Sequence, residues 1–153
     1  MMKDIDIQIS SSEWEVMRVV WANDRVTSKE IRDVLEQKME WKPATTKTFI
    51  GRLVKKGILE TEKEGNKFIY SPTITEEKFL KINLQETFGK ICSRDVGNTI
   101  VHLISNATLS FKDIDKLEKA MELKKEEAVD EVPCNCTPGQ CRCTHRDCCK
   151  ECN

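Results

Sequence analysis

The stretch that decides the fold runs from Thr45 to Pro72 and reads TTKTFIGRLVKKGILETEKEGNKFIYSP. Its first half has the three- and four-residue apolar spacing of a helix, which we expect to begin near Pro43 and to stop at Gly57. Two β-rich runs follow, at 58–62 and 67–70, with Glu64-Gly65-Asn66 as the turn between them. The stretch therefore predicts a helix followed by a β-hairpin.

Two more helices are expected upstream, because capping boxes occur at Ser10 with Glu13 and at Thr27 with Glu30. The faces expected to be buried are Trp14, Met17 and Trp21 in the first helix and Ile31, Val34 and Leu35 in the second. Three short helices and a hairpin follow the order of a winged helix-turn-helix domain, in which the third helix enters the DNA major groove.

The third helix has a distinctive charge. Five cations and no carboxylate lie between Lys42 and Lys56, whereas the rest of residues 1–73 has twelve acidic and eight basic side chains. Phe49, Ile50, Leu53 and Val54 share one apolar face with Thr46. Small hydroxyls and long cations suit a phosphate-lined groove, although a merely solvated basic face is the alternative. The candidate DNA contacts in the helix and the wing are Thr45, Lys47, Thr48, Arg52, Lys55, Lys63 and Lys67.

Composition divides the chain into four parts. We expect a winged-helix domain at 1–73, a helical dimerisation region at 74–121, a charged linker at 122–133 and a cysteine-rich metal-binding tail at 134–153. The second part consists of short amphipathic helices, which cannot bury their apolar faces alone, so a homodimer is expected. The predicted fold class is thus mainly α with a small β wing.

Seven of the eight cysteines lie at or after Cys134, and the remaining one, Cys92, is expected to be a small buried hydrophobe. Thiolates are soft ligands that select Zn(II) and Cu(I). A turn at Pro138-Gly139 would bring two C-x-C pairs together into a tetrahedral four-sulfur site. The candidate metal ligands are Cys134, Cys136, Cys141 and Cys143, with His145, Cys148, Cys149 and Cys152 as possible additional ligands. A metallothionein-like or thiol-redox tail is the competing interpretation.

The segments ISSSEWEVMRVVW (9–21) and TSKEI (27–31), together with the stretch from Thr45 to Pro72, resemble the BlaI/MecI family of winged-helix repressors. With the cysteine tail, the whole chain resembles the copper-responsive members of that family. The resemblance implies a homodimer that represses a copper-transport operon by binding a palindromic operator. It also implies Zn(II) in the repressing form, Cu(I) as inducer, and Cys134, Cys136, Cys141 and Cys143 as the metal ligands.

Other control mechanisms stay open at this stage. The family's antibiotic-responsive members are controlled by proteolysis, and Zn(II) or Cd(II) could replace copper as the signal. A copper chaperone is a further expected partner, as the source of Cu(I).

Several classes of protein do not fit the sequence. No phosphate loop, nucleophile elbow, HExxH or Ser/His/Asp grouping is visible, so an enzyme is not expected. The CKEC motif at 149–152 has redox spacing but no βαβ context. No apolar run approaches the roughly 20 residues of a membrane span. The acidic start has no signal-peptide core, so a cytoplasmic location with reduced thiols is expected.

Overall fold

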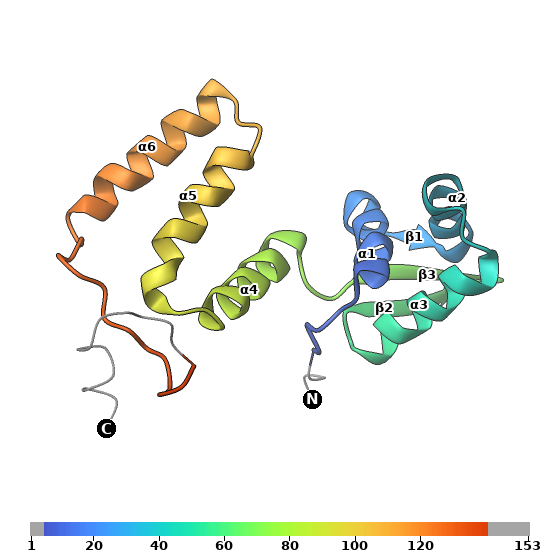
Figure 1. The fold of residues 1–153 in the computed structure, drawn as a ribbon. Coiled ribbons are helices and arrows are strands. Elements are labelled where there is room, and N and C mark those ends of the chain that lie inside the picture. Colours follow the sequence, from blue (N-terminus) through green and yellow to red (C-terminus); the bar gives the residue numbers. More distant parts are fainter. Residues whose placement is uncertain (1–4, 141–153) are drawn as a thin grey trace. The chain divides into compact units, whose positions relative to one another are not determined.

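The computed structural model describes residues 5–140 of the chain (Figure 1). These residues form two compact units, of which the first ends at Asn83 and the second begins at Leu84. Each unit has its own candidate site, and one helix, at 76–89, crosses the division between the units in the chain. No helix among the described residues has the length and apolar character needed to cross a membrane.

The N-terminal unit has the winged-helix order that the sequence predicts. Its elements are α1 (Ser11–Asn23), β1 (Val26–Thr27), α2 (Ser28–Met39), α3 (Pro43–Lys55), β2 (Leu59–Glu64) and β3 (Lys67–Pro72). The three strands form an antiparallel sheet in the order β1-β3-β2, so the hairpin strand β3 pairs on both sides. The predicted fold class is confirmed.

Local sequence signals fix the helix ends. The Ser10 hydroxyl accepts a hydrogen bond from the Glu13 amide at 3.1 Å, and the Thr27 hydroxyl accepts one from the Glu30 amide at 3.2 Å. The reciprocal bonds from the cap amides to the two carboxylates complete both capping boxes. Hydrogen bonds from Thr27, the backbone one first, lower the pKa of Glu30. Both predicted helix starts are therefore confirmed.

The core of this unit is built from α1, α2 and α3 and is closed by the start of α4 (Glu76–Gly89). Phe79 is fully buried, with its ring centroid 5.2 Å from that of Trp14 and 5.3 Å from that of Trp21. The Trp21 indole also donates to the Ile74 carbonyl at 3.0 Å. The compact unit therefore extends to Asn83, rather than to the expected residue 73, because α4 supplies part of its core.

One predicted core residue is wrong. Val34 is 45% exposed, whereas Ile31 and Leu35 on the same helix are fully buried. At 100° per residue, Ile31 and Leu35 differ by 40° while Val34 lies well to one side of both. The stripe that α2 buries is narrower than the apolar residues suggested.

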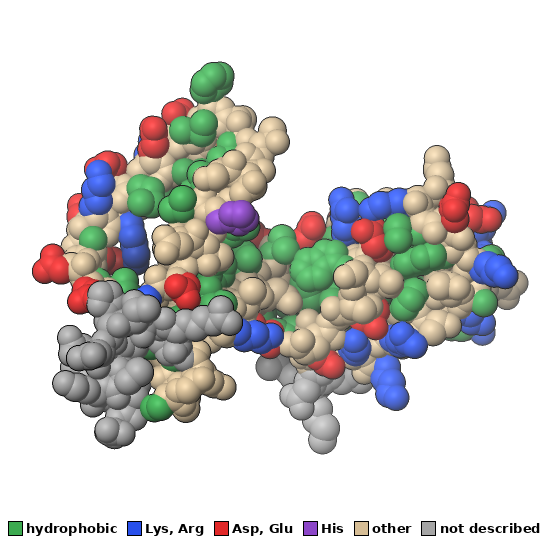
Figure 2. Space-filling model, in the orientation of Figure 1, with side chains coloured by type: hydrophobic (Ala, Val, Ile, Leu, Met, Phe, Trp, Pro, Cys, Tyr) green, Lys and Arg blue, Asp and Glu red, His purple; other side chains and the backbone are tan. Residues whose placement is uncertain are grey.

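The second unit begins within α4 and then contains a short 3-10 helix η1 (Ser93–Asp95), α5 (Val96–Asn106) and α6 (Phe111–Lys125). The Ser110 hydroxyl accepts a hydrogen bond from the Asp113 amide at 3.1 Å and so caps α6. Neither α5 nor α6 buries a residue within the described chain. Figure 2 shows hydrophobic side chains on the visible surface of these helices. The large exposed apolar residues of α5 and α6 are Ile100, Val101, Leu103, Ile104, Phe111, Ile114, Met121 and Leu123.

Candidate nucleic-acid interface and thiol cluster

The outward face of α3 carries small side chains and is open to solvent. Thr46 is 1% exposed and faces the core with Ile50 and Leu53, as the helical spacing predicts. On the opposite side lie Thr48 and Gly51, and a methyl group added at Gly51 would meet no atom within 4 Å. Small side chains on an exposed helix face permit close approach to a flat or grooved partner.

Two of the predicted cations flank this face on different sides. Lys47 and Gly51 help to line a groove of about 580 Å³ between α3 and the wing residues Phe68 and Tyr70. On the other flank, the Arg52 guanidinium carbon lies 5.6 Å from the centroid of the Phe49 ring, which supports it by a cation–π contact. The two side chains therefore present positive charge on both edges of α3.

The fifth cation of the basic stretch is used by the fold itself. The Lys56 ammonium donates to the buried Glu13 carboxylate at 2.7 Å and to the Gln8 carbonyl at 2.7 Å. The other four cations of the stretch, which are Lys42, Lys47, Arg52 and Lys55, are exposed. None of these four forms an ion pair with a residue that the structure describes. Their charge is thus available to an anionic partner.

The hairpin separates the two lysines of the wing. Its register pairs Lys63 with Phe68 and Glu64 with Lys67 across a two-residue turn. Side chains that are paired across strands share a face of the sheet, so Lys63 shares the side of Phe68 and Lys67 shares the side of Glu64. Arg25 forms ion pairs with Glu62 and Glu64, at 3.6 and 3.5 Å, on the Lys67 side. The sequence-based prediction missed this separation, because it placed Glu64 in the turn, whereas Glu64 ends β2 and pairs with Lys67.

Thr45 is half-buried at the first turn of α3, whereas Thr48 is exposed and its hydroxyl donates to the Ala44 carbonyl at 3.0 Å. The sequence-based prediction did not identify Phe68 as a residue of this interface, because it relied on cations and helical periodicity. Phe68 is 50% exposed at the wing edge of the groove. Its place beside the groove follows from strand alternation once the hairpin register is known.

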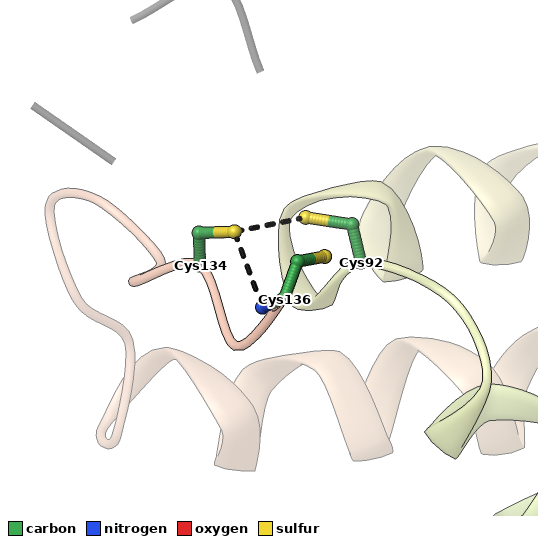
Figure 3. Close-up of side chains that lie close together, drawn as sticks. All are labelled: Cys92, Cys134 and Cys136. Atoms are coloured by element: carbon green, nitrogen blue, oxygen red, sulfur yellow. Dashed lines mark hydrogen bonds between the residues drawn. The ribbon is translucent and has the colours of Figure 1, made fainter. Parts of the chain in front are cut away.

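Three cysteines meet in the second unit (Figure 3). The Cys92 sulfur lies 3.7 Å from the Cys134 sulfur, and the Cys136 amide donates to the Cys134 sulfur at 3.4 Å. All three sulfurs lie within 4.8 Å of one another. Cys134 and Cys136, two of the four cysteines predicted as ligands, thus lie in one cluster with a third thiol from a distant part of the chain.

The prediction that Cys92 is a buried hydrophobe is wrong. Cys92 is half-buried and lies after the end of α4, immediately before η1, rather than on the apolar face of a helix. Its backbone conformation there directs the sulfur toward the tail (Figure 3). The spacing of 42 residues to Cys134 carries no motif from which this meeting could have been read.

The chemistry of the cluster suits a soft cation. Burial, followed by hydrogen bonds with Cys92 and Cys134, raises the pKa of the Cys136 thiol far above its usual range. Three adjacent thiolates would repel one another without a cation between them, and a bound metal displaces the thiol protons. Tetrahedral Zn(II) with Zn–S near 2.3 Å requires sulfurs about 3.8 Å apart, which the Cys92–Cys134 pair already approaches. The donor set therefore fits Zn(II) or Cu(I).

The remaining predicted ligands lie outside the described residues. These are Cys141, Cys143, His145, Cys148, Cys149 and Cys152.

The fold and the basic face of α3 define a winged-helix DNA-binding protein. A family model described as "Penicillinase repressor" matches residues 9–123. The chain belongs to this family of DNA-binding transcriptional repressors, which confirms the family resemblance seen in the sequence. The cysteine tail begins after the matched region ends.

Among similar proteins, an uncharacterized 16.5 kDa protein in the ptsI 3′ region of Latilactobacillus sakei is 43% identical, over 89% of this chain and 93% of its own length. A penicillinase repressor of Bacillus licheniformis is 30% identical, over 77% of this chain and 92% of its own length. A solved structure described as the CopR repressor is 48% identical, with a TM-score of 0.39, over 44% of this chain and 97% of that one.

We expect the two wing lysines to differ in their effect on DNA binding. Lys63→Ala should reduce the salt dependence of operator affinity by about one unit of slope, as for a lost phosphate contact. Lys67→Ala should have a smaller effect, because Lys67 shares its face with Glu62 and Glu64. Titrations of labelled operator at several salt concentrations measure both slopes. A larger change for Lys67→Ala would mean that the opposite edge of the wing approaches DNA.

Proposed function

We propose that this protein is a copper-responsive repressor of the CopY type, which controls a copper-transport or copper-homeostasis operon. The single observation that carries the proposal is the thiol cluster of Cys92, Cys134 and Cys136 in the same chain as a winged helix with a basic α3 face. A family of repressors supplies the DNA-binding function, and soft sulfur ligands supply a means to respond to a soft metal.

The proposed DNA contact places α3 in the major groove of a double-stranded operator. Lys47 and Arg52 would contact bases or phosphates from the two flanks of α3, with Thr45, Thr48 and Lys55 beside them. The exposed wing residues Lys63 and Lys67 would contact the sugar–phosphate backbone. Support comes from the absence of ion pairs at the exposed α3 cations within the described chain, and from the open space over Gly51.

The proposed active species is a homodimer on a palindromic operator. The second unit supports this arrangement, because α5 and α6 leave large apolar side chains exposed in one chain. Ile104, Ile114 and Met121 line a shallow apolar groove there that a second copy would cover. A two-fold dimer would then match the two half-sites of a palindrome.

For the signal, we propose Zn(II) as the resident metal of the repressing form and Cu(I) as the inducer. Cys134, Cys136, Cys141 and Cys143 are the proposed ligands, and His145, Cys148, Cys149 and Cys152 are proposed to extend the site. A copper chaperone is the proposed donor of Cu(I). The fit of the described sulfurs to a soft ion, by spacing and donor type, supports this assignment.

The test uses reduced, anaerobic protein and a labelled palindromic operator. Zn(II) is loaded first, Cu(I) is then titrated, and fluorescence anisotropy and bound metal are followed together. The proposal predicts that DNA is released as Cu(I) displaces Zn(II). Operator binding that persists through full copper loading would overturn the copper response and direct attention to Zn(II), Cd(II) or proteolysis as the signal.

Arg52→Ala should weaken operator binding by about 1–3 kcal/mol if the guanidinium reads a base edge. The reason is geometric, because the Phe49 ring holds this cation at the edge of the α3 face. Anisotropy titrations at fixed salt give the change in affinity. Lys119→Ala, an exposed lysine of α6, is the matched control and should bind as the unchanged protein does. Equal affinities for both variants would show that another face of α3 contacts the DNA.

A further inference from the structure

The second unit holds the end of the described tail against the connection between α4 and α5. The Ser93 amide donates to the Asn135 side-chain carbonyl at 2.9 Å, and the Ser93 hydroxyl donates to the Pro133 carbonyl. Arg94 donates from Nε to the Val132 carbonyl at 3.0 Å and forms an ion pair with Glu131 at 3.1 Å. These contacts involve no sulfur atom, so they place the two segments together independently of the cysteines.

Residues 131–133, in the segment 122–133 that we expected to be a charged linker, are exposed but are held to residues 93–94 by these contacts. Arg94 is the residue that makes the difference, since its side chain is only 21% exposed and contacts two successive residues of this segment. Hydrogen bonds hold residues 93–94 beside residues 131–135. Cys92 precedes the first segment and Cys136 follows the second, so their side chains lie close together (Figure 3).

The spacing of the three sulfurs matches one bound ion. Three thiolates at about 2.3 Å from a common ion lie about 3.8 Å apart in a tetrahedral site and about 4.0 Å apart in a trigonal one. The observed Cys92–Cys134 distance is 3.7 Å, and no pair of sulfurs exceeds 4.8 Å. Shifts of less than an ångström in side-chain positions would complete either geometry.

We propose that Cys92 is a third protein ligand of the ion that Cys134 and Cys136 bind. Binding of one Zn(II) or Cu(I) would release the thiol protons and leave three metal–sulfur bonds, so that Cys92 takes one of the four positions that the proposed function assigns to tail cysteines. The bound ion would then fasten the tail to the residues that precede α5. This inference rests on the proposed function only for the identity of the metal.

The position of Cys92 would connect the bound metal directly to the helices of the second unit. Cys92 occupies the position just before η1, and η1 runs directly into Val96 at the start of α5. A change in metal or in coordination at Cys92 would act on the end of a helix that carries the exposed apolar residues. A site made of tail cysteines alone would lack this connection.

The first experiment maps thiol protection in the full, reduced chain. The protein is alkylated with N-ethylmaleimide with and without one equivalent of Zn(II), and the modified cysteines are located by mass spectrometry. Cys92 should be protected by Zn(II) together with Cys134 and Cys136, and a chelator should restore its reaction. Protection of Cys134 and Cys136 while Cys92 reacts at an unchanged rate would overturn the inference.

The second experiment uses the Cys92→Ser variant with Co(II) as a spectroscopic probe. Each cobalt–thiolate bond contributes to the near-ultraviolet charge-transfer absorption, so the variant should show a weaker band and at least about tenfold lower metal affinity. Ser105→Ala, on α5 and away from the cluster, should match the unchanged protein. An undiminished cobalt band in Cys92→Ser would contradict the assignment. Protection mapping on the unchanged chain decides the matter even if this variant folds poorly.

The two proposals fail in different ways. Zn(II) protection of Cys92 without copper-induced release of DNA would keep the three-thiol site and overturn the copper response. Copper-induced release with Cys92 unprotected would keep the copper response and overturn the role of Cys92.

Discussion

Replacing Phe79 with alanine lowers the free energy of unfolding of the N-terminal unit by about 3–5 kcal/mol. The side chain is fully buried and packs against two tryptophan rings, edge-on to Trp14 and tilted to Trp21, so its removal leaves a cavity as well as lost aromatic contacts. Urea unfolding followed by tryptophan fluorescence measures the effect. That signal reports on this unit alone, because Trp14, Trp21 and Trp41 all lie in it.

Leu84→Ala is the matched control for Phe79→Ala. Leu84 lies on the same helix but is 53% exposed, so the tryptophan-monitored transition should shift by less than about 1 kcal/mol. A similarly small shift for Phe79→Ala would mean that α4 does not contribute to the winged-helix core in solution. The expected result instead assigns the first half of α4 to the DNA-binding unit.

Cys134→Ser removes the part of operator affinity that depends on Zn(II), expected to be roughly 5–150-fold as for a typical allosteric coupling. Cys134 contacts both other members of the cluster, since its sulfur lies 3.7 Å from the Cys92 sulfur and accepts a hydrogen bond from the Cys136 amide. Because the cluster is separate from the N-terminal core, the helical fold and the apo affinity should stay unchanged. Anisotropy with and without Zn(II), together with circular dichroism, measures both properties.

Cys152→Ser, which changes one of the residues proposed only to extend the site, is the comparison variant and should lose a smaller part of the Zn(II) dependence than Cys134→Ser. Equal losses in both variants would favour an undifferentiated metallothionein-like tail. Loss of helical structure in Cys134→Ser would show that the metal supports the fold instead of regulating it.

The winged helix was readable from the sequence because its signals are local. Capping boxes at Ser10 and Thr27, the glycine after α3 and the hairpin each depend on a few neighbouring residues, and all of them appear in the structure, although the hairpin turn is Gly65-Asn66 and leaves Glu64 in β2. The burial of Thr46 followed in the same way from helical period. Helical periodicity alone overestimated how much of the apolar face of α2 is buried. It does not show how wide the packed face is, and Val34 lies outside that face.

The sequence by itself thus determined the family, the order of the elements and the basic character of α3. Tertiary structure decided which cations are available, since the Lys56–Glu13 ion pair joins residues 43 positions apart. It decided the extent of the N-terminal core, through the packing of Phe79 between Trp14 and Trp21. It also decided that Cys92 meets the tail, because contacts of Ser93 and Arg94 with residues 131–135 bring together segments that no local pattern connects.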